Sequence, residues 1–334
     1  MPASSACILG LAGPQLAAAE AALFAARPPA GIILFRRNVE TPAQLRALTG
    51  VLRALLPAGA PILVDQEGGR VARLRPPHWR AQPPAGAIGA LHARDTAAGL
   101  RAAWLTGALI GADCAAAGIG MACAPVLDLR LPSMHDVVGD RGFAADPAAV
   151  AALGRAMAEG LLAAGVIPVA KHAPGHGRAR VDSHLALPEV DADDLSGDIH
   201  PFATNADLPV MMTAHIRYLA LDPDRPATLS PRVVAEVIRG RIGFAGLLLS
   251  DDLAMQALSG TPAERAGQAL AAGCDIALYC PGDAAGNAAI LEALPALTAA
   301  AGARLAAATA RAAAARRMLD PSALAAERDR LLPA

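Results

Sequence analysis

The chain contains short apolar runs of strand length, each followed by a longer stretch in which apolar residues recur with helical spacing. The runs lack the polar alternation of half-exposed strands, which is typical of strands buried on both faces of a parallel sheet. Eight such runs occur, at residues 6–11, 31–35, 61–64, 121–126, 167–170, 209–213, 246–249 and 275–279. We therefore predict eight parallel strands separated by helices.

The segments between the runs carry signals for helix starts. Thr41-Pro42-Ala43-Gln44 and Thr261-Pro262-Ala263-Glu264 resemble a capping box with proline at the first helical position. Three further pairs combine a capping residue with proline: Asp146-Pro147, Ser230-Pro231 and Asp320-Pro321. Helices are expected to begin at these positions.

Eight strand-then-helix units in 334 residues predict an α/β fold, the (β/α)8 TIM barrel. We expect residues 1–334 to form a single catalytic domain, with the alanine-rich segment from about residue 298 forming C-terminal helices outside the barrel. A doubly wound open sheet is the alternative. Its nucleotide-binding fingerprint is matched poorly by Gly10-Leu11-Ala12-Gly13, because the third glycine is missing at the required place.

Composition and charge narrow the classes of partner. The net charge of −1 gives no basis for binding nucleic acid or an anionic membrane, and 3% aromatic residues disfavour stacking of aromatic side chains on single-stranded nucleic acid.

The five cysteines form no CxxC pair, so we expect neither a disulfide framework nor a zinc knuckle, and the cysteine pattern fits a protein of a reducing compartment. The N-terminus lacks the basic region of a signal peptide, and no uninterrupted apolar stretch reaches transmembrane length. We expect a soluble, cytoplasmic protein.

Polar residues follow the apolar runs at the positions where a barrel places its active site, the C-terminal ends of the strands. A single aspartate there, such as Asp252, often only caps a helix or forms a turn, and a lone histidine is often structural. Here charged and imidazole groups follow five of the runs, so they should converge at one end of the barrel. Such a collection of polar groups suits a polyhydroxylated or anionic small ligand. They are Asp65, Glu67, Arg70, Arg73, Asp128, Arg141, Lys171, His172, His176, Asp182, His184, His215, Asp251 and Asp252.

A metal site is one reading of this cluster. Four residues of the fifth loop could supply ligands: His172, His176, Asp182 and His184. A spacing of four between histidines binds zinc when a helix holds them, but Pro174, Gly175 and Gly177 exclude a helix here. We expect no metal.

Acid–base and nucleophilic chemistry is the other reading. Asp251 ends a strand, where its carboxylate can be held rigidly under a substrate. Asp182 and His184 lie two residues apart, so the carboxylate can orient the imidazole and raise its basicity. The glycines around His176 would let this loop close over a bound substrate.

Four motifs resemble those of family 3 glycoside hydrolases, in the family's order and over about residues 5–315. They are VDQEGGRVARLR (64–75), APVLD (124–128), KHAPGHG followed by DSH (171–184) and SDDLAM (250–255). The resemblance is greatest to the family's single-domain bacterial β-N-acetylglucosaminidases of peptidoglycan recycling. It implies a retaining exo-enzyme that removes β-linked N-acetylglucosamine from N-acetylglucosaminyl-1,6-anhydro-N-acetylmuramic acid, with or without its stem peptide.

The resemblance also implies roles for individual residues. Asp251 matches the nucleophile, His184 the acid/base and Asp182 its paired aspartate. The residues matching positions that hold the sugar are Asp65, Arg73, Arg141, Lys171 and His172. The family needs neither a metal nor an organic cofactor. The expected partner is the substrate, a small amino-sugar or muropeptide, and we expect the protein to be a monomer.

The sequence departs from the family's pattern at Ala173, where phenylalanine is usual, at Ala254, where serine is common, and over residues 76–86. These changes remove no reacting group, although they could alter the packing of the loop or of the pocket entrance.

Three alternative functions stay open. They are a related family 3 β-glycosidase, an N-acetylglucosaminide phosphorylase, since a histidine acid/base repels phosphate less than a carboxylate does, and a sugar-binding protein without catalysis.

Overall fold

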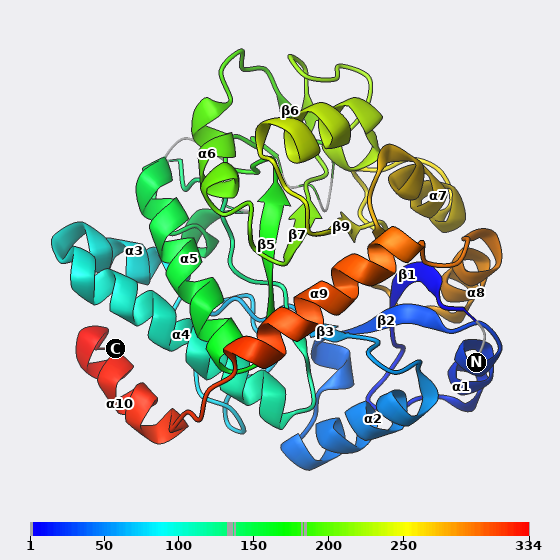
Figure 1. Cartoon of the computed structure of the whole chain (residues 1–334), viewed down its shortest axis with the longest axis horizontal. Coiled ribbons are helices and arrows are strands. Elements are labelled where there is room, and N and C mark those ends of the chain that lie inside the picture. Colours follow the sequence, from blue (N-terminus) through cyan, green and yellow to red (C-terminus); the bar gives the residue numbers. More distant parts are fainter. Residues whose placement is uncertain (1–2, 132–135, 137, 182, 184–185, 334) are drawn as a thin grey trace.

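The eight apolar runs form the strands of a closed parallel barrel. In the computed structural model the strand order around the barrel is β1-β10-β9-β7-β5-β4-β3-β2, which confirms the predicted TIM barrel (Figure 1). The strands are β1 (Ser5–Gly10), β2 (Pro29–Leu34), β3 (Ile62–Val64), β4 (Met121–Ala122), β5 (Ile167–Ala173), β7 (Val210–Thr213), β9 (Leu247–Asp252) and β10 (Ile276–Tyr279). The structure describes residues 3–131, 136, 138–181, 183 and 186–333.

Helices surround the barrel and connect its strands (Figure 1). They are α1 (Ala18–Ala26), α2 (Pro42–Leu55), α3 (Ala85–Arg94), α4 (Thr96–Ala116), α5 (Pro147–Ala163), α6 (Ser196–Thr204), α7 (Pro262–Ala272), α8 (Ala284–Ala293), α9 (Ala299–Ala315) and α10 (Pro321–Leu331), with a π-helical segment at Val233–Arg241. A small sheet pairs β6 (Glu189–Val190) with β8 (Arg217–Tyr218) above the barrel. None of the described helices is long and apolar enough to cross a membrane.

The predicted helix caps are present. The Thr41 hydroxyl accepts a hydrogen bond from the Gln44 amide, and Thr261 and Glu264 form a reciprocal capping box. Asp146 and Asp320 cap α5 and α10 in the same way. These side chains satisfy backbone N–H groups that the first helical turn leaves without partners.

Three strands end three or more residues from where the apolar runs predict, whereas β1 and β2 each end one residue early. β4 stops at Ala122, although backbone hydrogen bonds from Val169 to Ala124 and from Lys171 to Pro125 continue beside β5, and Val126 forms an isolated bridge to Lys171. β5 instead continues through Lys171 and His172 to Ala173, and β9 continues to Asp252. The polar residues were predicted to follow these two strands. They are in fact strand residues, but Lys171, His172 and Asp251 lie at register shifts, between the paired positions Ala170 and Ala173 of β5 and Leu249 and Asp252 of β9.

The barrel interior is filled by one face of each strand. Alternate residues of β1 divide between two clusters, with Ile8 in the interior and Cys7 and Leu9 packed toward the helices. The interior cluster also contains Leu305, Ala308 and Ala312 of α9, so this helix packs against the barrel core. The polar residues gather at the other end of the strands, their C-terminal end, as a TIM barrel requires of its active site.

Helices α4 and α5 approach closely because glycines lie at their crossing. A Cβ atom on Gly107 of α4 would lie 2.1 Å from the Met157 carbonyl oxygen of α5. A Cβ on Gly160 of α5 would in turn lie 2.2 Å from the Trp104 carbonyl oxygen of α4. The two helices therefore pack backbone against backbone, and neither position has room for a side chain.

Replacing Gly160 by alanine should lower the free energy of unfolding by about 1–3 kcal/mol, because the new methyl group forces the helices apart. Urea denaturation of the wild type and the variant measures this. Gly302→Ala on α9 is the matched control, since its Cβ would meet no atom within 4 Å, and helix propensity predicts a gain of up to about 1 kcal/mol. Similar changes in the two variants would contradict the close approach.

Candidate active site

A pocket opens at the C-terminal ends of the strands, and six of the eight predicted site residues line it. They are Asp65, Arg73, Arg141, Lys171, His172 and Asp251. The other two, Asp182 and His184, lie outside the described residues. The lining also includes Glu67, His176, Ser183 and Asp252, with apolar contributions from Ile33, Phe35, Met212 and Leu278.

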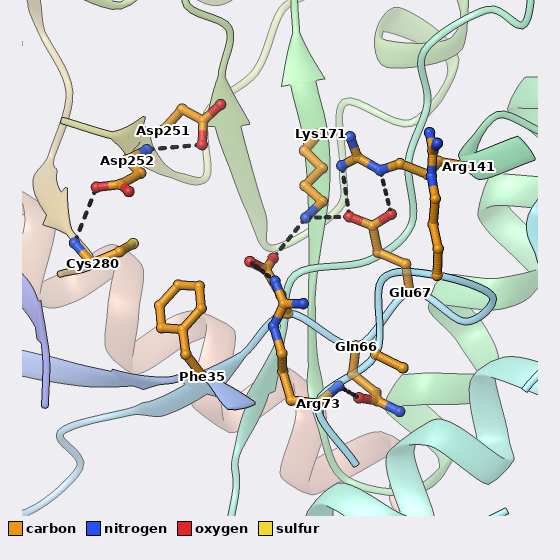
Figure 2. A network of polar contacts seen from close by, with 12 residues as sticks. Phe35, Gln66, Glu67, Arg73, Arg141, Lys171, Asp251, Asp252 and Cys280 are labelled. Carbon is orange, nitrogen blue, oxygen red and sulfur yellow. Dashed lines mark hydrogen bonds and ion pairs between the residues drawn. The ribbon is translucent and has the colours of Figure 1, made fainter. Parts of the chain in front are cut away.

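An ionic network occupies one side of the pocket (Figure 2). The Lys171 ammonium group lies 2.8 Å from Asp65 Oδ1 and 2.6 Å from Glu67 Oε1. Arg141 donates two parallel hydrogen bonds of 2.8 Å to the Glu67 carboxylate, and Arg73 lies 3.3 Å from Asp65. Lys171 is only 3% exposed, so its charge depends on these carboxylates.

Glu67 is central to this network, and its role was not predicted from the sequence. Burial alone would raise its pKa, but the charges and hydrogen bonds of Arg141 and Lys171 outweigh burial and lower the pKa to about 2. Burial likewise raises the pKa of Asp65, and Lys171 and Arg73 reverse the shift to a net lowering. Both carboxylates are therefore ionised at neutral pH.

A tight turn after β3 presents these carboxylates. Gly68 and Gly69 both have positive φ angles, of 107° and 52°, which favour glycine. The Gln66 carboxamide then accepts hydrogen bonds from the backbone N–H groups of Arg73 and Leu74, at 2.7 and 3.0 Å (Figure 2). This clamp holds the Arg73 backbone beside Asp65, so the sequence DQEGGRVAR folds back on itself.

Asp128 is a second residue whose role was not predicted, although the sequence places it after the fourth strand. Its carboxylate lies 2.6 Å from His172 Nδ1 and accepts hydrogen bonds from the backbone N–H groups of His172 and His176, at 3.1 and 2.7 Å. Burial raises its pKa, but the histidines and these hydrogen bonds give a net lowering. One buried carboxylate thus orients His172 and anchors the loop that follows β5.

Asp251 lies across the pocket from the turn, near the end of β9. Its Oδ1 accepts a 2.8 Å hydrogen bond from the Asp252 amide (Figure 2). Its own amide donates to Thr213 Oγ1 at 3.3 Å. Its other oxygen makes no hydrogen bond to the described residues. Burial raises its pKa, but His172, His215, the Asp252 amide and Lys171 lower it below the ordinary aspartate value. Asp251 is thus an ionised carboxylate with one oxygen free for chemistry.

Asp252 and His215 have structural partners, as expected of isolated polar residues at strand ends. Asp252 Oδ1 accepts hydrogen bonds from the amides of Ala254 and Cys280, both at 3.0 Å, and so joins β9 to β10. His215 is fully buried between Thr228 Oγ1 and the Asp252 carbonyl, 2.8 Å from each. His215 does not line the pocket, so it supports the Asp251–Asp252 segment from behind.

The metal reading gains no support from the described residues. Among them, no group of three or more His, Cys, Asp and Glu side chains is arranged to hold a metal ion. The rings of His172 and His176 lie edge to face, with centroids 5.6 Å apart. His172 is engaged by Asp128 through Nδ1, and His176 points Nε2 to Ser183 Oγ at 3.1 Å.

Glu67→Gln should lower the free energy of unfolding by about 3–5 kcal/mol, because it leaves Lys171 and Arg141 buried with too little negative charge. Glu327→Gln is the matched control. Glu327 pairs with Arg101 on the surface, so the loss there should be at most about 1 kcal/mol. Chemical denaturation of both variants distinguishes them, and comparable losses would show that the Glu67 network does not depend on burial.

His176 predicts a pH dependence of stability. Burial lowers its pKa from 6.5 to about 4, so between these values the unfolded chain binds a proton that the folded chain does not. Stability from this group is therefore complete above pH 6.5 and falls as the pH drops toward 4. The unfolding free energy of the wild type relative to His176→Gln should fall by roughly 1–3 kcal/mol over this window. A difference that is constant from pH 7 to 4 would refute a neutral buried His176.

Comparisons with known proteins agree with this geometry. The family model of the glycosyl hydrolase family 3 N-terminal domain matches residues 8–315. The β-hexosaminidase of Alkalilimnicola ehrlichii is 42% identical over 280 residues, which cover 82% of this chain and 80% of that protein. That of Bordetella avium is 43% identical over 260 residues, covering 75% and 73%.

Solved structures show the same likeness along the chain. The structure of NagZ from Neisseria gonorrhoeae in complex with N-trifluoroacetyl-D-glucosamine superposes with a TM-score of 0.88 at 30% identity, covering 99% of both chains. The β-N-acetylhexosaminidase of Beutenbergia cavernae gives a TM-score of 0.74 at 29% identity, covering 96% of both. The motifs, the barrel and these relatives agree, and the chain belongs to glycosyl hydrolase family 3.

Proposed function

We propose that this protein is a retaining exo-β-N-acetylglucosaminidase in which Asp251 is the nucleophile. The observation that carries the proposal is the state of Asp251: its pKa is lowered although it is buried, one oxygen is held by the Asp252 amide, and the other makes no hydrogen bond to the described residues. A retaining glycosidase needs such a carboxylate under the anomeric carbon. Both curated relatives described above are named β-hexosaminidases, which supports the same class of reaction.

The ionic network supplies the sugar-binding side of the proposed site. Asp65, Arg73, Arg141, Lys171 and His172 would hold the hydroxyl and acetamido groups, as the family resemblance implies. Because Glu67, Gln66 and Asp128 fix these groups before any ligand binds, binding energy is available to position the anomeric carbon over Asp251. The Neisseria relative, solved with N-trifluoroacetyl-D-glucosamine, supports an N-acylated glucosamine as the sugar.

The reaction then takes two steps. The free oxygen of Asp251 attacks the anomeric carbon while the bond to the leaving oxygen breaks, and His184 donates a proton to that oxygen. In the second step water attacks the anomeric carbon, the bond from that carbon to Asp251 breaks and restores the carboxylate, and His184 accepts the proton of the water. Asp182 orients the imidazole in both steps. The roles of His184 and Asp182 rest on the DSH motif, since both lie outside the described residues.

For the natural substrate we propose N-acetylglucosaminyl-1,6-anhydro-N-acetylmuramic acid, with or without its stem peptide. The support is the resemblance of the four motifs to cytoplasmic enzymes of peptidoglycan recycling, together with the NagZ relative. The proposal includes action by residues 1–334 as one monomeric catalytic domain in the cytoplasm, with no metal or organic cofactor.

The test is release of 4-nitrophenol from 4-nitrophenyl N-acetyl-β-D-glucosaminide by the wild type, Asp251→Ala and Asp320→Ala. Loss of the nucleophile should reduce kcat/KM by at least about 10⁴-fold, whereas the cap of α10 should matter little. Intact mass after reaction with a slow 5-fluoro glycosyl fluoride should rise by one sugar in the wild type and in Asp320→Ala, and stay unchanged in Asp251→Ala. Sugar binding without turnover would indicate a binding protein, and N-acetylglucosamine 1-phosphate formed in phosphate buffer would indicate a phosphorylase.

A further inference from the structure

His176 is a buried side chain of the pocket to which the proposed reaction gives no role. Its backbone is fixed at both ends: its N–H donates to Asp128 Oδ1 at 2.7 Å, and its carbonyl accepts from the Ala179 amide at 3.1 Å. The side chain is 3% exposed. Its ring is therefore held in a position determined by the same carboxylate that orients His172.

The segment around His176 is tied to the barrel at further points. The Tyr218 hydroxyl donates to the Gly175 carbonyl, and Arg178 pairs with the buried Asp198 of α6 at 2.6 Å. Gly177 packs so closely on Leu129 that a Cβ would lie 2.5 Å from the Leu129 carbonyl oxygen. This first part of the loop, residues 174–178, is thus a rigid extension of β5.

The ring of His176 reaches from this rigid part to the far part of the same loop. His176 Nε2 lies 3.1 Å from the hydroxyl oxygen of Ser183, which is itself 2% exposed. This is the one hydrogen bond that the Ser183 side chain makes to described residues. Ser183 stands in the chain between Asp182 and His184, the proposed acid/base pair.

Resting on the proposed function, we propose that His176 is a positioning residue that ties the acid/base segment, through Ser183, to Asp128 and the rigid end of β5. The path is continuous: Asp128 fixes the His176 backbone, the His176 ring holds Ser183, and the peptide chain carries the constraint to the residues on either side. A hydrogen bond placed one residue from a proton donor limits the positions that the donor can take. Efficient proton transfer requires the donor within hydrogen-bonding reach of the leaving oxygen.

Histidine suits this task because its ring is both rigid and neutral at this site. Burial keeps it uncharged near neutral pH, so it does not repel His172 or Arg141. Only the remote ring nitrogen reaches Ser183, while Nδ1 makes no hydrogen bond to the described residues. A side chain with its nitrogen at the Nε2 position should therefore replace it, and a shorter one should not.

The experiment uses that difference in reach. Glutamine carries an amide nitrogen near the position of Nε2, whereas asparagine carries one near Nδ1, so His176→Gln and His176→Asn form a matched pair of neutral amides. Ser183→Ala removes the same hydrogen bond from the other side and changes a single oxygen atom. The kcat/KM of each is measured on phenyl and on 2,4-dinitrophenyl N-acetyl-β-D-glucosaminide.

The two substrates separate proton donation from other effects. A phenol leaving group needs the acid, whereas 2,4-dinitrophenolate leaves without a proton. His176→Asn and Ser183→Ala should lose about 10- to 100-fold on the phenyl glycoside and less than about 3-fold on the dinitrophenyl glycoside. His176→Gln should stay within about 3-fold of the wild type on both, and combining His176→Asn with Ser183→Ala should add little to either single loss.

Two other results would overturn the proposed positioning role of His176. Equal losses on both substrates would mean that His176 supports the pocket as a whole, and a loss in His176→Gln as large as in His176→Asn would mean that the Ser183 contact is not what matters. Neither result would touch the proposed function, because the wild type and Asp251→Ala are assayed beside them. A wild type inactive on both glycosides would instead remove the proposed function itself.

Discussion

The buried ammonium group of Lys171 is the constraint on which the rest of the pocket depends. A lysine that is 3% exposed retains its charge only when carboxylates replace the water it has lost. Asp65 and Glu67 provide them at 2.8 and 2.6 Å, and each brings an arginine with it. The turn after β3 and the end of β5 are thereby joined, although 106 residues separate Asp65 from Lys171.

Asp128 holds His172 and His176 in place, as Glu67 holds Lys171 and Arg141 in place. It lies under the pocket, fully buried, and engages His172 and the backbone of His176 at the same time. Neither Asp128 nor Glu67 is proposed to react. Both hold charged or polar groups in place before substrate arrives, and such preorganisation lets binding energy be used on the transition state.

The residues proposed to act in the pocket include strand residues and residues of the segment that follows β5. Asp251, Lys171 and His172 belong to β9 and β5, where their amides donate to Thr213, Pro125 and Asp128 respectively, whereas the proposed acid/base motif follows β5 in the sequence. Ala173 and residues 76–86, where the chain departs from the family's pattern, do not line the pocket. Ala173 is part of the buried core, and Arg80 and Gln82 of the variable segment bond to Pro321 and Arg328 at the C-terminal helix. The Gly69 N–H also donates to the Gln82 carbonyl at 2.9 Å, so this segment packs between the C-terminal helix and the turn that presents Asp65 and Glu67.

The sequence by itself determined the barrel, because the eight uninterrupted apolar runs and the five predicted helix caps are local signals. It also identified Asp65, Arg73, Arg141, Lys171, His172 and Asp251, since a barrel brings the ends of its strands to one mouth. Only the tertiary structure decided which carboxylate pairs with which cation, and that β5 and β9 extend to include Lys171, His172 and Asp251. Pairing of this kind joins residues far apart in the chain, such as Glu67 with Arg141, and no local pattern encodes it. The roles of Glu67, Asp128 and Ser183 had to be read from distances for the same reason.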